Sequence, residues 1–194
     1  MKKLLLLLMA SFLEINATYA LQSVNLAYIK DRPSDTASIN VVKVVLENTG
    51  YNVNLIAVKD AKNLWKTVAL GNADGMVSAW LPDIHSRYLF RYEYDIDNLG
   101  PNLEGTRLGL VVPTYVSIDS IEELNANADR FGNRVIGIES TEDIMSLTYY
   151  AISRYYKLKQ FKLRFGNKEQ ITNILAAAID NHQWIVATGW TKIA

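Results

Sequence analysis

The chain has 194 residues, with 20 lysines and arginines against 20 aspartates and glutamates, so its formal net charge is zero. A balanced charge offers no extended basic face, and nucleic acid is therefore excluded as an expected partner. Hydrophobic residues make up 49% and charged residues 21%, which is typical of a folded globular chain. Because cysteine is absent, disulfides, thiolate metal sites and cysteine nucleophiles are excluded.

Residues 1–20 have the organisation of a secretory signal peptide. Two lysines precede an apolar run from Leu4 to Leu13, and Thr18-Tyr19-Ala20 provides the small residues of a cleavage site. The apolar run is too short for a membrane-spanning helix. We therefore predict cleavage after Ala20 and export to a periplasm, with an uncleaved anchor as the alternative.

The first half of the remaining chain alternates predicted strands and helices. Short apolar or alternating runs predict strands over residues 24–29, 51–58, 76–80 and 108–112. Apolar residues at helical spacing predict helices over residues 35–49 and 61–70. Gly50 suits the end of the first helix, and Asp60 suits the cap of the second. Residues 83–107 are more polar and rich in tyrosine.

The second half continues this alternation. Ser120 to Glu123 form a capping box, which predicts that a helix begins there. Residues 134–138 and 184–188 are predicted strands. A helix opens at Thr141 or a neighbour, and Asn167 with Gln170 form a weaker capping box for the next helix.

This order of elements predicts an α/β protein with mainly parallel sheets. The pattern runs twice, with a break between the two runs. We expect a first lobe at residues 23–112, a linker at residues 113–119, and a second lobe at residues 120–194. A cleft is expected between the lobes.

The sequence contains none of the usual motifs of an enzyme or a cofactor site. Neither His85 nor His182 has the spacing of a metal-binding helix, and no nucleophile elbow or glycine-rich nucleotide motif occurs. The carboxylate pairs Glu122/Glu123 and Glu142/Asp143 fall at predicted helix starts, where acidic residues stabilise the positive helix end. We therefore expect no enzymatic activity, no metal ion and no cofactor.

Two tryptophans are the sequence features that indicate a ligand-binding site. Trp80 ends one predicted strand and Trp190 follows another. In parallel α/β sheets, ligands bind beyond the carboxyl ends of strands. Two indole faces meeting there suit a methylated ammonium, which has no N–H to donate. Ordinary core packing of either tryptophan is the alternative.

Several separated motifs, in their common order, resemble the substrate-binding proteins of ABC transporters for glycine betaine and related quaternary amines such as choline and proline betaine. The resemblance runs from Val24 to about Thr191. Its most specific stretches are SAWLPDIH (78–85), LGPNLEG (99–105) and TGWT (188–191). The others are LAY (26–28), VLENTGY (45–51), LWKTVALGNAD (64–74), GLVVP (109–113), SIEEL (120–124) and GIE (137–139).

The resemblance implies a two-lobed, type II periplasmic-binding-protein-like fold that closes on a small ligand. Such a protein acts as a monomer and delivers the ligand to the permease and ATPase of the transporter. The resemblance places Trp80 and Trp190 in an aromatic cage for the ammonium group and His85 near the ligand carboxylate. It also assigns the carboxylate to backbone N–H groups of Asp143 and Ile144, and a helix N-terminus is a suitable anion site.

The sequence departs from the family pattern in three places. Lys30-Asp31-Arg32 stands where a further cage tryptophan is usual, so Asp31 is a weaker candidate for opposing a cation. Thr141-Glu142-Asp143 replaces a glycine-rich stretch beside the expected carboxylate site. The TGW motif is normally followed by several dozen residues that complete the lobes, which predicts a C-terminally truncated second lobe. Trp65 is expected mainly to pack, with a place at the cleft edge as the alternative.

These departures leave the ligand open. Glycine betaine or a similar zwitterion is the first hypothesis. The acidic pair Glu142 and Asp143 favours choline or another cation without a carboxylate. A sensor domain without a transport role, or a truncated fragment that binds no ligand, is the remaining alternative.

Overall fold

The computed structural model describes residues 22–138 and 143–191. The predicted signal peptide and the residues Thr141 and Glu142 lie outside this part. Contacts between Cα atoms group the chain into two compact units, Met1–Ser78 and Ala79–Ala194, and each is described by itself. The lobe boundary expected at residues 113–119 stays a prediction.

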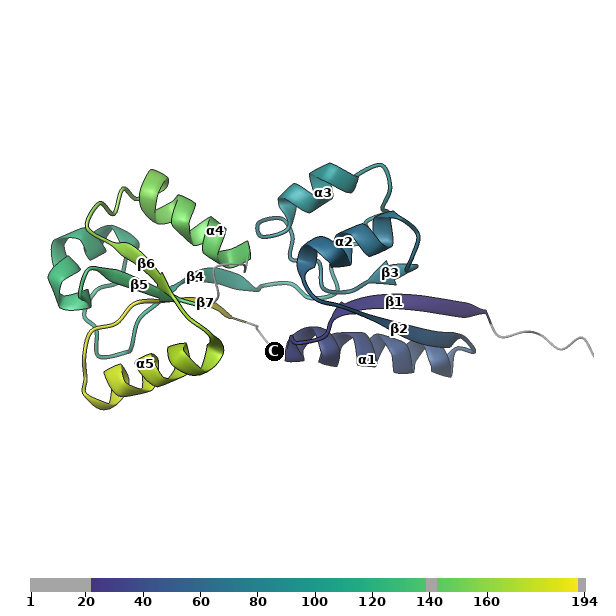
Figure 1. The fold of residues 1–194 in the computed structure, drawn as a ribbon, viewed down its shortest axis with the longest axis horizontal. Helices are drawn as coiled ribbons and strands as arrows, with labels where there is room; N and C mark the ends of the chain where they lie inside the picture. Colours follow the sequence, from purple (N-terminus) through teal and green to yellow (C-terminus); the bar gives the residue numbers. More distant parts are fainter. Residues whose placement is uncertain (1–21, 139–142, 192–194) are drawn as a thin grey trace, which may run out of the picture. The chain divides into compact units, whose positions relative to one another are not determined.

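The first unit is a three-stranded parallel sheet with a helix on each face (Figure 1). Its central strand β1 (Ser23–Ile29) pairs with β2 (Asn52–Val58) on one side and with the short β3 (Gly75–Met76) on the other. Helices α1 (Pro33–Asn48) and α2 (Ala61–Ala69) cover the two faces. This arrangement follows from the predicted strand–helix alternation.

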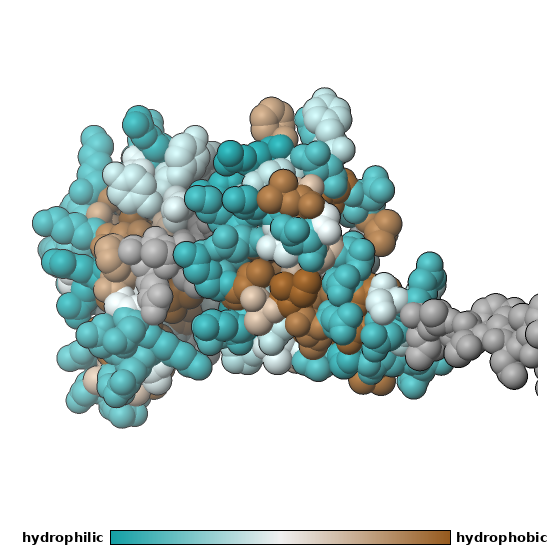
Figure 2. Space-filling view, turned by 45° about the vertical axis from the view of Figure 1, so that its right-hand side comes forward, coloured by the Kyte–Doolittle hydropathy of each residue, from teal (hydrophilic) through white to brown (hydrophobic). Residues whose placement is uncertain are grey.

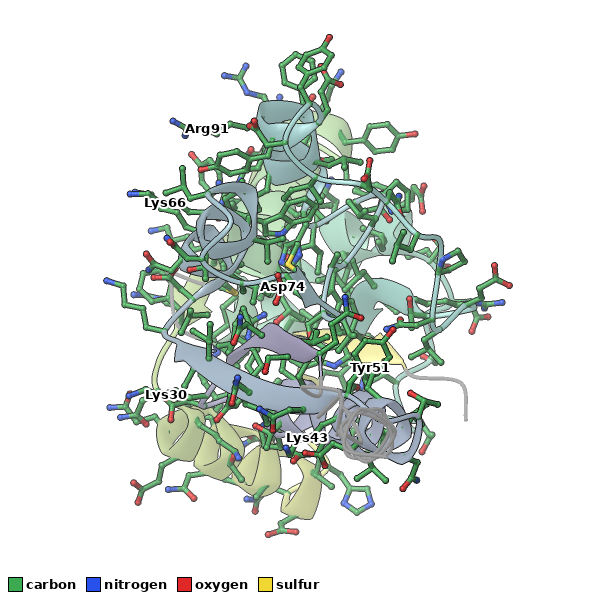
Figure 3. The ribbon with its side chains drawn as sticks, turned by 90° about the vertical axis from the view of Figure 1, so that its right-hand side faces the viewer. Lys30, Lys43, Tyr51, Lys66, Asp74 and Arg91 are labelled. Atoms are coloured by element: carbon green, nitrogen blue, oxygen red, sulfur yellow. The ribbon has the colours of Figure 1, made fainter. Side chains whose placement is uncertain are left out.

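Polar contacts tie the elements of this unit together. Lys43 reaches from α1 to β2, where its Nζ donates to the Val53 carbonyl at 2.8 Å. Asp74 accepts from the Asn25 backbone N–H at 2.6 Å and so joins the approach to β3 to strand β1. Figure 3 labels both of these charged side chains. The Asp60 side chain caps α2 by accepting from the Asn63 N–H at 2.8 Å, as the sequence predicts.

The core of the first unit forms on both faces of its sheet. Leu26, Ile39 and Val53 pack together between the sheet and α1. On α2, the side chains of Leu64 and Trp65 are 0% and 1% exposed. Three valines of α1 remain at least half exposed, namely Val41, Val44 and Val45. Figure 2 shows apolar side chains in separate brown groups among hydrophilic ones on the face that it draws.

The second unit contains a four-stranded mixed sheet in the order β4-β7-β5-β6. Its strands are β4 (Arg107–Val111), β5 (Arg134–Gly137), β6 (Lys162–Phe165) and β7 (Ala187–Thr191). Strand β5 runs parallel to β6 and β7, whereas β4 is antiparallel to β7. Its helical segments are α3 (Ser86–Tyr92), the 3₁₀ helix η1 (Ile121–Phe131), α4 (Asp143–Tyr150), the π-helical turn η2 (Ala151–Tyr155) and α5 (Lys168–Asp180).

Helices α4 and α5 lie on opposite sides of this sheet (Figure 1). Because side chains alternate along a strand, Val135 packs with η1 on one face while Ile136 packs with α5 on the other. Both capping boxes predicted for η1 and α5 are present. Among the described helices, none has the length and apolar character needed to cross a bilayer.

Two predicted strands are wrong in extent. The strand expected over residues 76–80 ends at Met76, and the backbone of Trp80 bonds to His85 instead of to a neighbouring strand. The strand expected over residues 184–188 is β7, which lies three residues later. There the TGWT stretch pairs with β4, while Ile185 and Val186 pack into the core.

Candidate functional site

The candidate site lies where strand β7 extends beyond the end of its parallel neighbour β5. Ile136 of β5 lies opposite Ala187 of β7, and β5 ends at the next residue, Gly137. The rest of β7 therefore extends past the carboxyl end of β5, and it carries Trp190. Ligands of parallel α/β sheets bind at this kind of strand end.

Helix α4 starts at the same strand end. Met145, in its first turn, lies so close to Gly137 that a Cβ atom there would overlap the Met145 thioether. The same Cβ would lie 3.4 Å from Thr188 Oγ1 of β7. Ile144 and Met145 are 6% and 3% exposed, and α4 packs on β7. Gly137 thus permits the start of α4, with the backbone of Asp143 and Ile144, to approach β5 and β7.

The indoles of Trp80 and Trp190 form the aromatic part of the candidate site. Their ring centroids are 6.4 Å apart, and their planes meet at 76°. Trp190 is 46% exposed and Trp80 is partly buried, so neither ring is enclosed by the core. A cation interacts with a ring when it lies within about 6 Å of its centroid. With this separation, one cation can satisfy that condition for both rings.

His85 lies beside Trp80 and is bonded to it twice. The Trp80 backbone N–H donates to His85 Nδ1 at 3.0 Å, and the His85 N–H donates to the Trp80 carbonyl at 2.9 Å. The His85 side chain is 0% exposed, and the ring of Tyr88 packs against it at 5.7 Å. The structure therefore brings Trp80, Trp190 and His85 together within the second unit.

The two weaker candidates belong to the first unit. Asp31 has a side chain that is 83% exposed, with an oxygen 4.0 Å from Lys30 Nζ. It borders an open surface pocket of about 550 Å³, lined also by Lys30, Pro33, Thr36, Ala37 and Asn40. Trp65 is buried in α2, which is the environment of a packing residue. Within the described residues, no group of histidines and carboxylates could hold a metal ion.

Sequence reasoning missed the packing that supports this site. Neither Met145 nor Thr188 was expected beside Gly137, and Tyr88 was not expected beside His85. The only available signal was a glycine at the end of a predicted strand, which often marks a close approach of another segment. No feature of the sequence indicated the contact of Tyr88 with His85, because the short helix α3 was not predicted.

Comparison with known proteins decides the family. The family described as the substrate-binding domain of the ABC-type glycine betaine transport system matches residues 22–191. The chain belongs to this family.

Similar members of the betaine-binding family come from several bacteria. The glycine betaine/carnitine transport binding protein GbuC of Listeria monocytogenes is 42% identical over 95 residues, which are 48% of this chain and 31% of that protein. Lactococcal OpuAC in its closed form with glycine betaine is 39% identical, with a TM-score of 0.75 over 88% of this chain and 65% of that one. ProX of Borrelia burgdorferi is 34% identical, with a TM-score of 0.76 over 88% of this chain and 63% of that one.

These likenesses confirm the predicted type II α/β fold of periplasmic binding proteins. The chain spans about a third of the length of the Listeria protein over the aligned region, and just under two thirds of the two solved relatives.

Proposed function

We propose that this chain captures a quaternary amine of the glycine betaine type and passes it to the permease and ATPase of an ABC transporter. The observation that carries the proposal is the pair of nearly perpendicular indoles, Trp80 and Trp190, with centroids 6.4 Å apart. Both belong to motifs of the glycine betaine family. The family consists of substrate-binding proteins, and the proposal includes no catalytic step.

The indole pair recognises the ammonium group of the ligand. Its methyl groups carry the positive charge and cannot donate conventional hydrogen bonds, so aromatic faces suit them better than carbonyl oxygens do. Each ring contributes roughly 0.5–2 kcal/mol, with the larger values in a site that excludes water. An amine without methyl groups is hydrated more strongly and should bind more weakly.

The start of α4 is proposed to receive the carboxylate of a zwitterionic ligand. The first N–H groups of a helix have no partner within the helix, and those of Asp143 and Ile144 are of this kind. The positive end of the helix dipole adds a favourable interaction of about 0.3–1 kcal/mol. His85, beside Trp80, is proposed to complete this group.

Choline is the second candidate ligand, and the acidic sequence around α4 favours it. A ligand carboxylate about 6 Å from a negative side chain is repelled by roughly 3 kcal/mol at an effective dielectric near 20. We expect the double substitution Glu142→Gly and Asp143→Gly to raise the affinity for betaine more than that for choline. Equal changes for the two ligands would show that these charges do not act on the site.

Substrate-binding proteins of this family work outside the cytoplasm. We propose that the chain is exported, cleaved after Ala20 and active as a monomer in the periplasm. N-terminal sequencing of the exported protein should begin at Leu21, and a start at Met1 would contradict cleavage. Sedimentation of the purified protein with and without ligand tests whether the protein is monomeric.

Titration of the full chain tests the proposed function. Isothermal calorimetry with glycine betaine, choline and carnitine should show saturable binding of at least one, and glycine should bind much more weakly as the unmethylated control. Failure of all three methylated ligands would contradict a transport role and favour a sensor domain or a non-binding fragment.

A further inference from the structure

Thr188 lies between the core of the second unit and the indole of Trp190. Because side chains alternate along a strand, Val186, Thr188 and Trp190 project from the same face of the sheet. Val186 packs with Val135 on this face, whereas Ala187 packs on the other. Exposure rises along the face, since Val186 is 0% exposed, Thr188 is half-buried and Trp190 is 46% exposed. Thr188 therefore marks the step from the core to the candidate site.

The neighbours of Thr188 on this face are apolar or lack a side chain. Leu110 of β4 lies opposite Thr188 in the antiparallel pairing. On the other side, a Cβ atom on Gly137 would lie 3.4 Å from Thr188 Oγ1 and would overlap the thioether of Met145. The atom of Thr188 nearest to this point is the hydroxyl oxygen. The hydroxyl is therefore turned towards the end of β5 and the first turn of α4.

The hydroxyl of Thr188 has no structural task in this position. Within residues 22–138 and 143–191, it makes no hydrogen bond to another residue. A polar group in partly apolar surroundings loses free energy unless it has a hydrogen-bond partner. A β-branched residue suits a strand, but valine would meet that need without a polar atom. The hydroxyl is thus available to a ligand.

We propose that Thr188 is a specificity-determining residue, whose Oγ1–H donates a hydrogen bond to the carboxylate of a zwitterionic ligand. This inference rests on the proposed function and deepens it, because the ligand is the quaternary amine held by Trp80 and Trp190. Two residues of a strand span about 6.6 Å, so Trp190 and Thr188 can contact the two ends of one small ligand. The N–H groups proposed for the carboxylate belong to the two residues that precede Met145.

A hydroxyl at this place discriminates between betaine and choline by hydrogen-bond strength. Towards a carboxylate it makes a charge-assisted bond, which is about twice as strong as a bond between neutral groups. Choline ends in a neutral hydroxyl and gains only the weaker bond. Because threonine carries no charge, it favours the zwitterion without repelling the cation. Thr188 therefore acts against the preference for choline that the acidic residues around α4 introduce.

The substitution Thr188→Val removes the hydroxyl and keeps the shape of the side chain. Isothermal calorimetry of the full chain should show a loss of betaine affinity of about tenfold or more, and a loss of choline affinity of at most about threefold. Thr188→Ser keeps the hydroxyl, so its betaine affinity should lie between those of the wild type and Thr188→Val. Equal losses for the two ligands would overturn the proposal, and so would a serine variant as weak as the valine variant.

Thr172→Val is the matched control for the loss of a threonine hydroxyl. Thr172 is exposed on α5, on the opposite side of the sheet from α4 (Figure 1), and its Oγ1 donates to the Lys168 carbonyl at 2.8 Å. This variant should bind betaine and choline with the affinities of the wild type. A change in the ratio of the two affinities as large as that of Thr188→Val would overturn the proposal. Circular dichroism checks that each variant keeps its fold.

A measurement on the wild-type protein tests the same inference without a substitution. Nuclear Overhauser contacts should join the methylene protons of bound betaine, which lie next to its carboxylate, to the methyl group of Thr188. Bound betaine without these contacts would overturn the proposal even if no variant folds. If the wild type binds no quaternary amine, the proposed function fails and this inference fails with it. If it binds betaine and Thr188→Val keeps the wild-type ratio of affinities, this inference alone fails.

Discussion

Trp65 in the first unit and Trp190 in the second carry the same side chain in opposite environments. Trp65 lies inside the core against the sheet and is 1% exposed, whereas Trp190 stands at the free end of β7 with 46% of its surface exposed. An indole inside a core contributes mainly to folding. An indole at a strand end, with another indole 6.4 Å away and much of its surface exposed, contributes less to the fold, and we propose that it contacts a ligand.

The largest expected effect is that of Trp65→Ala. This substitution leaves a cavity in the first unit, and the free energy of unfolding should fall by roughly 3–5 kcal/mol. Urea denaturation followed by circular dichroism measures the loss. Trp190→Ala is the matched control and should change stability by less than about 1 kcal/mol, because its ring is half exposed. Similar losses for the two variants would remove the distinction drawn between the two tryptophans.

Binding should show the opposite order. Trp80→Ala and Trp190→Ala should each weaken binding of betaine or choline by roughly 0.5–2 kcal/mol, and the double variant should show no measurable binding. Trp184→Phe is the control, because Trp184 packs against Phe131 and Arg130 within the second unit. Calorimetry of the four variants would contradict the cage if Trp184→Phe had the larger effect.

The approach of α4 to the sheet gives a smaller effect. In Gly137→Ala, the new methyl group meets Met145, which must move within a packed interior. We expect a loss of about 1 kcal/mol, at the low end for overpacking because methionine is flexible. Gly109→Ala in β4 is the matched control, since a methyl group added there has no atom within 4 Å. Met145→Ala combined with Gly137→Ala should recover the steric part of the loss in a double-mutant cycle.

Asp31 should show the smallest effect. Its side chain is exposed, and a carboxylate oxygen lies 4.0 Å from Lys30 Nζ in an ion pair of the neighbouring residues. Asp31→Asn should therefore change stability by less than about 0.5 kcal/mol and leave betaine affinity unchanged. A selective loss of choline affinity would instead assign Asp31 to the ligand site. Thermal unfolding and calorimetry of this variant separate the two outcomes.

The sequence predicts best what depends on neighbouring residues. The Asp60 cap and the capping boxes at Ser120 and Asn167 all form as predicted, because each involves groups three residues apart. Strand extents are less predictable, since they depend on pairing. Residues 77–80 lie outside β3, with the backbone of Trp80 bonded to His85, and β7 is displaced by its pairing with β4.

In the candidate site too, local features can be predicted from the sequence and tertiary contacts cannot. Trp80 and Trp190 can be selected from sequence because the first ends a predicted strand, the second follows one, and both lie within family motifs. Their separation cannot be predicted, since it depends on the register of β7 and on the folded loop from Trp80 to His85. The close packing of Met145 on Gly137 is likewise a tertiary contact without a local pattern.

The most direct test of the aromatic site is an NMR measurement of the bound ligand. Nuclear Overhauser contacts would be recorded between the N-methyl protons of glycine betaine or choline and assigned indole protons. We predict contacts to Trp80 and Trp190, and none to Trp65 or Trp184. Saturable binding with N-methyl contacts to neither Trp80 nor Trp190 would contradict the account.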